Sequence, residues 1–215
     1  MCAIIQLHIF TPFQNIGGTE NKTMDDGLFI TKVILMLFGI RGFNPVESES
    51  KRFKSWVARM DATTCKICAG HNGKIYYKFM DPEIEFPPHP NCRCKLKTLV
   101  AIRACTATIE GKDGADYWIK RRKKLPENYL TKGEAEALGW VRQSGNLQDV
   151  IPGGIIGGDI YENKKGKIPQ SPGRIWFEAD INYTGGRRNE HRLLYSNDGL
   201  VFVTYDHYET FYEIK

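Results

Sequence analysis

No cysteine follows Cys105 in the sequence, no apolar run is long, and neither sign of charge dominates. Residues 106–215 must therefore fold without disulfide bonds among themselves. The apolar stretch 27–40 is too short to cross a bilayer and contains Lys32, which predicts that it packs in a core. Residues 1–10 lack the basic start and small-residue cleavage site of a signal peptide, so we expect synthesis in the cytoplasm.

The net charge of +5 is too small to indicate nucleic-acid binding by bulk attraction. Residues 1–110 contain 14 Lys and Arg against 10 Asp and Glu, a balance of +4, and residues 111–215 contain 16 against 15, a balance of +1. A phosphate site in the second part must therefore come from the local arrangement of side chains. A hydrophobic share of 41% and an aromatic share of 12% predict a folded core and exclude a disordered chain.

Composition and turn signals divide the chain into three predicted parts. Residues 1–50 form an N-terminal segment without an assigned role, 51–106 a small cysteine-rich module, and 107–215 a larger domain. In the larger domain, helix signals come first and strand signals follow. This order is typical of an α+β fold with an antiparallel sheet.

Local patterns place the individual elements. The segment 48–68 predicts a helix at its start, because Ser48 or Ser50 can cap it and apolar residues follow at helical spacing, namely Phe53, Trp56, Val57 and Met60. Thr131 and Glu134 form a capping box that predicts a helix start. The other predicted helices cover 115–126 and 146–152, and the predicted strands lie within 155–161, 174–183, 192–196, 199–206 and 210–215.

Five soft metal ligands are closely spaced in the cysteine-rich module. They form two groups, Cys65-x₂-Cys68 and His89-x₂-Cys92-x-Cys94. A tetrahedral structural zinc needs four such ligands and would stabilise a region with little core of its own. Cys92 and Cys94 are crowded if both bind one ion, and His89 can replace one of them. The alternatives are reduced cysteines in a small core or a disulfide.

Polar side chains that can act on a phosphodiester gather in the last part of the chain. Alternation along 174–183 places Glu178 on the wetter face of a strand. Arg188 and Arg192 are four residues apart, which directs both to one side of an extended chain, and His207 follows an apolar strand. Lys132 lies in the first turn of its helix, where free N–H groups favour an anion.

These residue types suit RNA cleavage by the substrate's own 2′-hydroxyl. The reaction needs a base for the 2′ proton, for which we predict Glu178, and an acid for the departing 5′ oxygen, for which we predict His207. Arg188 and Arg192 would hold the phosphate oxygens, because the guanidinium fork matches two of them. The pattern alone also fits an antiparallel domain with a solvated basic turn.

Residues 114–215 resemble the barnase-type bacterial ribonucleases along nearly the whole of that domain. The matching stretches are LPENYLTKGEAEALGW, GNLQDV, IGGDIY, ADINYTGG, RNEHRLLYS and DHYETF. The resemblance implies helices packed on a five-stranded antiparallel sheet and metal-free cleavage through a 2′,3′-cyclic phosphate. It assigns the catalytic positions to Glu178, His207, Arg188, Arg192 and Lys132.

One position departs from the family pattern. Where the family has an acid that binds the guanine edge, this sequence has Lys165, which cannot accept those N–H bonds. The resemblance therefore does not predict the base preference. It implies that the substrate base is lined by Tyr161, Asn163 and Lys164 and stacks on Tyr208.

Residues 53–98 are similar to the C-terminal end of phage head morphogenesis proteins of the Mu F type, in the stretches DATTCKICAGHNGKIY and PPHPNCRCKL. Such domains are found fused to toxin domains, so we predict an endoribonuclease toxin with a carrier module. The expected partners are RNA, an acidic inhibitor similar to barstar, and a phage capsid or delivery component, with no membrane. The protein would be exported or packaged and would act in the cytoplasm of a target cell. The alternative is a non-catalytic head-assembly protein with a degenerate nuclease tail.

Overall fold

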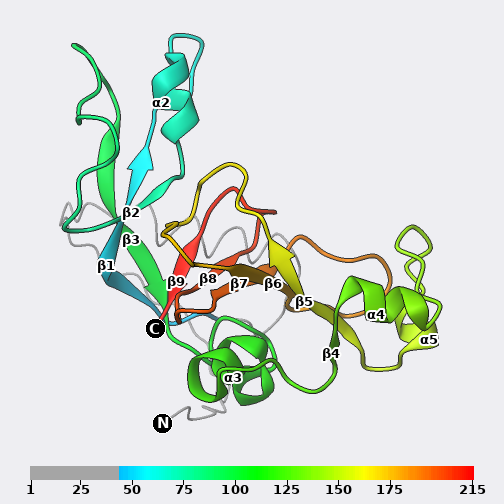
Figure 1. The fold of residues 1–215 in the computed structure, drawn as a ribbon. Helices are drawn as coiled ribbons and strands as arrows, with labels where there is room; N and C mark the ends of the chain where they lie inside the picture. The colour runs from blue at the N-terminus through cyan, green and yellow to red at the C-terminus, as the bar shows by residue number, and fades with distance from the viewer. Residues whose placement is uncertain (1–43) are drawn as a thin grey trace, which may run out of the picture. The chain divides into compact units, whose positions relative to one another are not determined.

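The computed structural model describes residues 44–215, whose strands form one sheet of nine in the order β2-β1-β3-β9-β8-β7-β6-β5-β4 (Figure 1). The predictions for residues 1–43, including the apolar stretch 27–40, lie outside the described residues. The strands are β1 (Glu47–Val57), β2 (Ile75–Tyr77), β3 (Lys95–Ile102), β4 (Tyr129–Leu130), β5 (Ile155–Tyr161), β6 (Trp176–Asp180), β7 (Arg192–Ser196), β8 (Val201–Thr204) and β9 (Tyr212–Ile214).

The C-terminal strands confirm the α+β prediction, but the sheet is larger than expected. Strands β5 to β9 pair antiparallel in chain order. The predicted five-stranded sheet is wrong as a description of the whole sheet, because β4 adds to β5 in parallel and β3 adds to β9 in parallel. These additions join segments far apart in the sequence, which local alternation cannot reveal.

The predicted helix at the start of 48–68 is wrong, because this segment is strand β1. Ser50, Phe53 and Trp56 are all buried, three residues apart. A regular strand buries alternate residues, but β1 has an irregular register against β3 between Glu49 and Lys54. The irregularity produces a three-residue spacing that resembles a helical one.

The helices of the C-terminal part begin close to where the sequence predicts. They are α3 (Ala115–Arg122), α4 (Lys132–Ala137) and α5 (Leu147–Val150), and the remaining helical elements are α2 (Lys66–His71) and η1 (Gly111–Asp113). The capping box of α4 is formed, since Thr131 Oγ1 accepts from the Glu134 N–H and the Glu134 carboxylate accepts from the Thr131 N–H at 2.8 Å. This cap fixes the first turn of α4 beside β5. Within residues 44–215, none of the helices has the length and apolar character that crossing a bilayer requires.

A single hydrophobic cluster joins the two ends of the described chain. Phe53 of β1 and Ile75 of β2 are buried in the same cluster as Trp176, Phe202 and Phe211. Fully burying a side chain of this size stabilises a fold by roughly 1.5–3 kcal/mol. The division into parts at 1–50, 51–106 and 107–215 stays a prediction, while in the structure residues on both sides of position 106 share one core and one sheet.

Candidate active site

Strand β6 carries two carboxylates on one face, and that face is buried. Glu178 is 9% exposed and Asp180 is 1% exposed, and Trp176 on the same side packs against Phe202. The prediction that this is the wetter face is wrong. Ile175, just before the strand and on the opposite face, is exposed, whereas Glu178 and Asp180 are buried. A buried carboxylate must be hydrogen-bonded or paired, so the contacts of Glu178 and Asp180 define the site.

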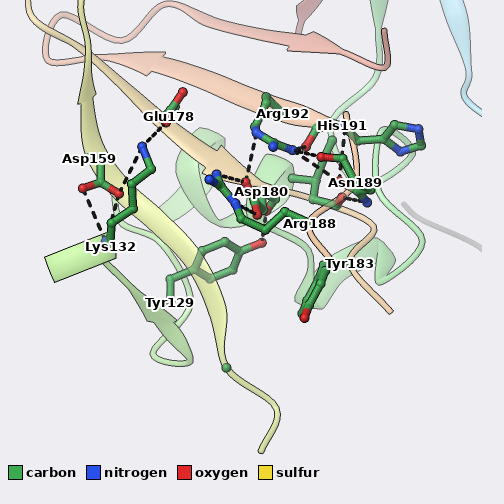
Figure 2. Close-up of polar contacts among 12 residues, drawn as sticks. Tyr129, Lys132, Asp159, Glu178, Asp180, Tyr183, Arg188, Asn189, His191 and Arg192 are labelled. Carbon is green, nitrogen blue, oxygen red and sulfur yellow. Dashed lines mark hydrogen bonds and ion pairs between the residues drawn. The ribbon is translucent and has the colours of Figure 1, made fainter. Parts of the chain in front are cut away.

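Glu178 is held by two donors. Lys132 Nζ donates to Oε1 at 2.6 Å (Figure 2). The Tyr208 hydroxyl donates to Oε2 at 2.6 Å. Burial alone would raise the pKa of Glu178, but these two hydrogen bonds, together with the positive charges of Lys132 and Arg188, lower the pKa below its ordinary value. Glu178 is therefore an ionised group that can accept a proton.

Lys132 occupies the first position of α4, as predicted, but the anion at this helix start is a carboxylate of the protein. The Lys132 N–H donates to Asp159 Oδ2 at 3.1 Å, and Lys132 Nζ lies 3.9 Å from the same oxygen. Sequence reasoning missed Asp159. The available signal was a carboxylate within the predicted strand 155–161. In the structure Asp159 pairs in register with Glu178 on β6.

Asp180 gathers the two predicted phosphate-binding arginines (Figure 2). Arg188 donates from Nε at 2.6 Å and from Nη2 at 2.7 Å, and Arg192 Nε lies 3.0 Å from Asp180 Oδ1. Burial alone would lower the pKa of Arg188, but Asp180 raises it. Arg192 also donates through Nη1 to the backbone oxygen of Asn189 at 2.6 Å. Asp180 was missed as an anchor, although its place two residues after Glu178 puts both carboxylates on one face.

His207 lies in the turn after β8 and is exposed. It lines a pocket together with Arg188, Arg192, Arg142 and Arg187. Neither Arg142 nor Arg187 forms an ion pair in the part of the chain that the structure describes. Sequence reasoning also missed these two arginines, because they lie in loops, where the sequence has no periodic pattern that shows which way a side chain points.

The aromatic ring of Tyr208 connects the two ends of this site. Its hydroxyl binds Glu178, and its ring centroid lies 4.9 Å from that of His207. The general base and general acid predicted from the sequence are thus neighbours of one side chain. The arginines beside His207 can bind phosphate oxygens, a carboxylate can take a proton from a hydroxyl, and an imidazole can give one to a departing oxygen.

The residues predicted to line the base differ in burial and in the partners that they contact. Tyr161 stacks on Tyr208 with ring centroids 5.2 Å apart. The Asn163 amide donates to the Ile168 oxygen at 2.8 Å and is buried within its own loop, so its side chain shapes the loop. Lys164 is exposed and pairs with Glu162 at 2.6 Å. Lys165 is also exposed, 3.7 Å from Glu209.

The five predicted metal ligands converge at one place. Cys65 Sγ and Cys68 Sγ lie 3.3 and 3.2 Å from His89 Nε2, and Cys68 Sγ lies 3.8 Å from Cys92 Sγ. Cys94 joins Cys68 and Cys92 in a second overlapping group. The structure describes these four cysteines as free thiols.

Comparison with known proteins covers the C-terminal half of the chain. A ribonuclease family model matches residues 112–215. Ribonucleases of Heyndrickxia coagulans, Bacillus intermedius and Bacillus pumilus are each 51% identical over 109 residues, or 51% of this chain. The match covers 100% of the first relative and 67% of the other two. The family match contains Lys132, Glu178, Arg188, Arg192 and His207 and excludes the cysteine cluster.

Proposed function

Since the chain belongs to the ribonuclease family and is an endoribonuclease, we propose that it cuts RNA by attack of a 2′-hydroxyl on the adjacent phosphorus. The observation that carries this mechanism is the buried Glu178 carboxylate, which accepts from Lys132 and from Tyr208, whose ring also contacts His207. The products are one strand with a 2′,3′-cyclic phosphate and one with a free 5′-hydroxyl.

The steps of this reaction are divided among the residues of the site. Glu178 takes the proton of the 2′-hydroxyl as the bond from O2′ to phosphorus forms. The bond from phosphorus to O5′ breaks, and His207 gives its proton to the departing oxygen. Arg188 and Arg192, aligned by Asp180, bind the non-bridging oxygens, where charge accumulates. Lys132 holds Glu178 in place and adds positive charge near the attacked phosphate.

The products of cleavage test this mechanism. We expect purified protein to cleave RNA during a short exposure to EDTA and to leave 2′,3′-cyclic ends, because no step in the proposal uses a metal. DNA of the same sequence should remain intact, since it has no 2′-hydroxyl. Circular dichroism in the same buffer checks that the fold survives the chelator. Cleavage of the DNA, or 5′-phosphate ends on the RNA, would contradict the mechanism.

In this proposal the base is bound by stacking on an aromatic ring, without a strict preference for guanine. Tyr161 and Tyr208 offer an aromatic stack beside Glu178, and Lys164 is exposed on the loop that follows β5. Lys165 replaces the acid that the family resemblance would require for guanine. Sequencing the ends of cleaved RNA measures the preference directly, and a strict guanine preference would contradict the role assigned to Lys165.

The cysteine cluster is best explained as a structural zinc centre built from four of the five ligands. Ligand sulfurs at about 2.3 Å from a tetrahedral zinc lie about 3.8 Å apart, and Cys68 and Cys92 have that spacing. The other ring nitrogen of His89 lies 2.9 Å from the Pro90 oxygen, to which it can donate, leaving Nε2 free to bind a metal. The centre would hold α2 and the start of β3 together.

Metal analysis tests the zinc centre. We expect one zinc per chain in protein purified without chelator, and a marked loss of both zinc and thermal stability in Cys68→Ala, because Cys68 belongs to both overlapping ligand groups. Lys66→Ala, next to the cluster but without a ligand atom, should keep its zinc. A wild-type preparation with far less than one zinc per chain would remove the proposal.

The biological role that fits these features is a toxin delivered by a phage-derived carrier. Support comes from the resemblance of residues 53–98 to Mu F-type head proteins and from the basic pocket, which suits an acidic inhibitor similar to barstar as well as RNA. Family membership favours this role over a non-catalytic head-assembly protein. Growth arrest of a host that expresses the chain without an inhibitor is the deciding measurement, and unimpaired growth would count against the toxin.

A further inference from the structure

Lys167 is a buried lysine whose ammonium group binds a single turn of the chain. The residue is 9% exposed, and its Nζ donates to the backbone oxygen of Tyr208 at 3.1 Å and to that of Glu209 at 3.4 Å. A further contact at 2.8 Å joins it to the Glu209 carboxylate. Burying a lysine is costly unless its donors are satisfied, so this arrangement fixes both the lysine and the turn that it contacts.

The turn bound by Lys167 presents the proposed general acid and has a strained backbone. His207 and Tyr208 are consecutive residues with φ of 51° and 69°, in the left-handed region that side chains other than glycine rarely adopt. Thr204 Oγ1 accepts from the Tyr208 N–H at 3.0 Å, and Asp206 Oδ1 accepts from the Glu209 N–H at 3.1 Å. The Lys167 ammonium donates to the backbone oxygens of Tyr208 and Glu209 in the same turn. These contacts together maintain the strained conformation.

Strand β2, far away in the sequence, supports Lys167 from the other side. The Ile75 N–H donates to the Lys167 backbone oxygen at 2.8 Å. Just before β2, Gly73 has a φ of 79°, and a Cβ placed there would lie 3.2 Å from the Glu209 oxygen. Ile75 is also packed in the same hydrophobic cluster as Ile168. A continuous set of contacts therefore runs from β2 through Lys167 to the His207–Tyr208 turn.

We propose that Lys167, supported by β2, is a positioning residue that holds the His207–Tyr208 turn against Glu178, so that residues outside the matched ribonuclease segment form part of the working active site. The inference rests on the proposed roles of Glu178 and His207. The 109-residue Heyndrickxia coagulans relative is too short to extend from the equivalent of β2 to that of β9. This support is therefore an addition in the present chain relative to that protein.

Kinetics of a Lys167→Met variant in the full chain test the proposal. The substitution keeps a long side chain and removes the ammonium group. We expect kcat to fall about 10–100-fold with little change in KM, since small misplacement of catalytic groups has effects of this size. The acidic limb of the pH profile should move to higher pH, because a displaced Tyr208 no longer lowers the pKa of Glu178. Thermal unfolding, followed in parallel, establishes that the variant is folded at the assay temperature.

Two controls separate positioning from a general structural effect. Tyr208→Phe should move the acidic limb in the same direction, and the double variant with Lys167→Met should show no further displacement. Gly73→Ala should reduce kcat in the same manner, whereas Gly70→Ala should not, because a Cβ at Gly70 meets nothing within 4 Å. Gly70 belongs to the same N-terminal region, so it is a matched control.

The outcomes distinguish failure of this inference from failure of the mechanism. Wild-type kcat and pH profile in Lys167→Met, with an inactive His207→Ala, would overturn the positioning role alone. Additive displacements in the double variant would also overturn it, since Lys167 would then act independently of Tyr208. Identical behaviour of Gly73→Ala and Gly70→Ala would overturn the part assigned to β2. Full activity of His207→Ala would instead reject the catalytic assignment on which the inference rests.

Discussion

Replacing His207 with alanine is expected to lower kcat/KM for RNA by about 10²–10⁴-fold, the range that a general acid contributes. Without the imidazole, the 5′ oxygen must leave as an alkoxide or take a proton from water. His207 is exposed, so its loss removes little buried surface, and the free energy of unfolding should hardly change. A large loss of activity in a variant of unchanged stability would therefore show that His207 acts in the chemical step.

Kinetics with a defined oligoribonucleotide measure this effect, and urea unfolding of the same preparations measures stability. Added imidazole should restore part of the His207→Ala rate, because a small acid can occupy the vacated position next to the exposed turn. A host that expresses His207→Ala should grow, while one that expresses the wild type should stop. Wild-type kinetics in the variant would remove His207 from the mechanism.

Replacing Asp180 with alanine is expected to destabilise the fold by about 3–5 kcal/mol, the usual cost of removing one partner from a buried ion pair. Asp180 is 1% exposed, and the Arg188 and Arg192 side chains are 10% and 6% exposed. Both guanidinium groups would keep their charge and lose the carboxylate that aligns them. Activity should also fall, because the arginines would no longer be held where the phosphate oxygens bind.

Urea unfolding of Asp180→Ala and of a surface control measures the difference. Glu162→Ala breaks the pair with Lys164, whose side chains are 64% and 81% exposed, and should change stability by less than about 1 kcal/mol. Asp180→Asn, which keeps the shape without the charge, should fall between the two. Equal stability losses in Asp180→Ala and Glu162→Ala would mean that the buried pair contributes no more than a surface one.

The parts of the fold that depend on local pattern could be predicted from the sequence. The capping box at Thr131 and Glu134 gave the start of α4, and alternation gave the strands that follow residue 154. The segment around Phe53 was mistaken for a helix because an irregular strand register imitated helical spacing. The pairing of β3 with β9 joins segments about a hundred residues apart, which no short window contains.

The residues of the candidate site likewise separate into those that the sequence could predict and those that it could not. Glu178 and His207 could be proposed because the chemistry demands a carboxylate and an imidazole, and a resemblance supplied their positions. Asp180, Asp159 and Lys167 were missed because their importance lies in contacts with distant partners. Burial makes those contacts strong, and burial of a charged residue cannot be read from its neighbours in sequence.

Pairing with β3 has a protective consequence for the last strand of the chain. In a sheet of β5 to β9 alone, the backbone groups of β9 would face outward and could recruit a strand from another molecule. Here β3 occupies that side, and the sheet instead terminates in β2 and β4, which have three and two residues. Strand β2 pairs with β1 only at Phe53, Lys54 and Ser55, so among the described residues it is the pairing of β3 that removes β9 from the edge of the sheet.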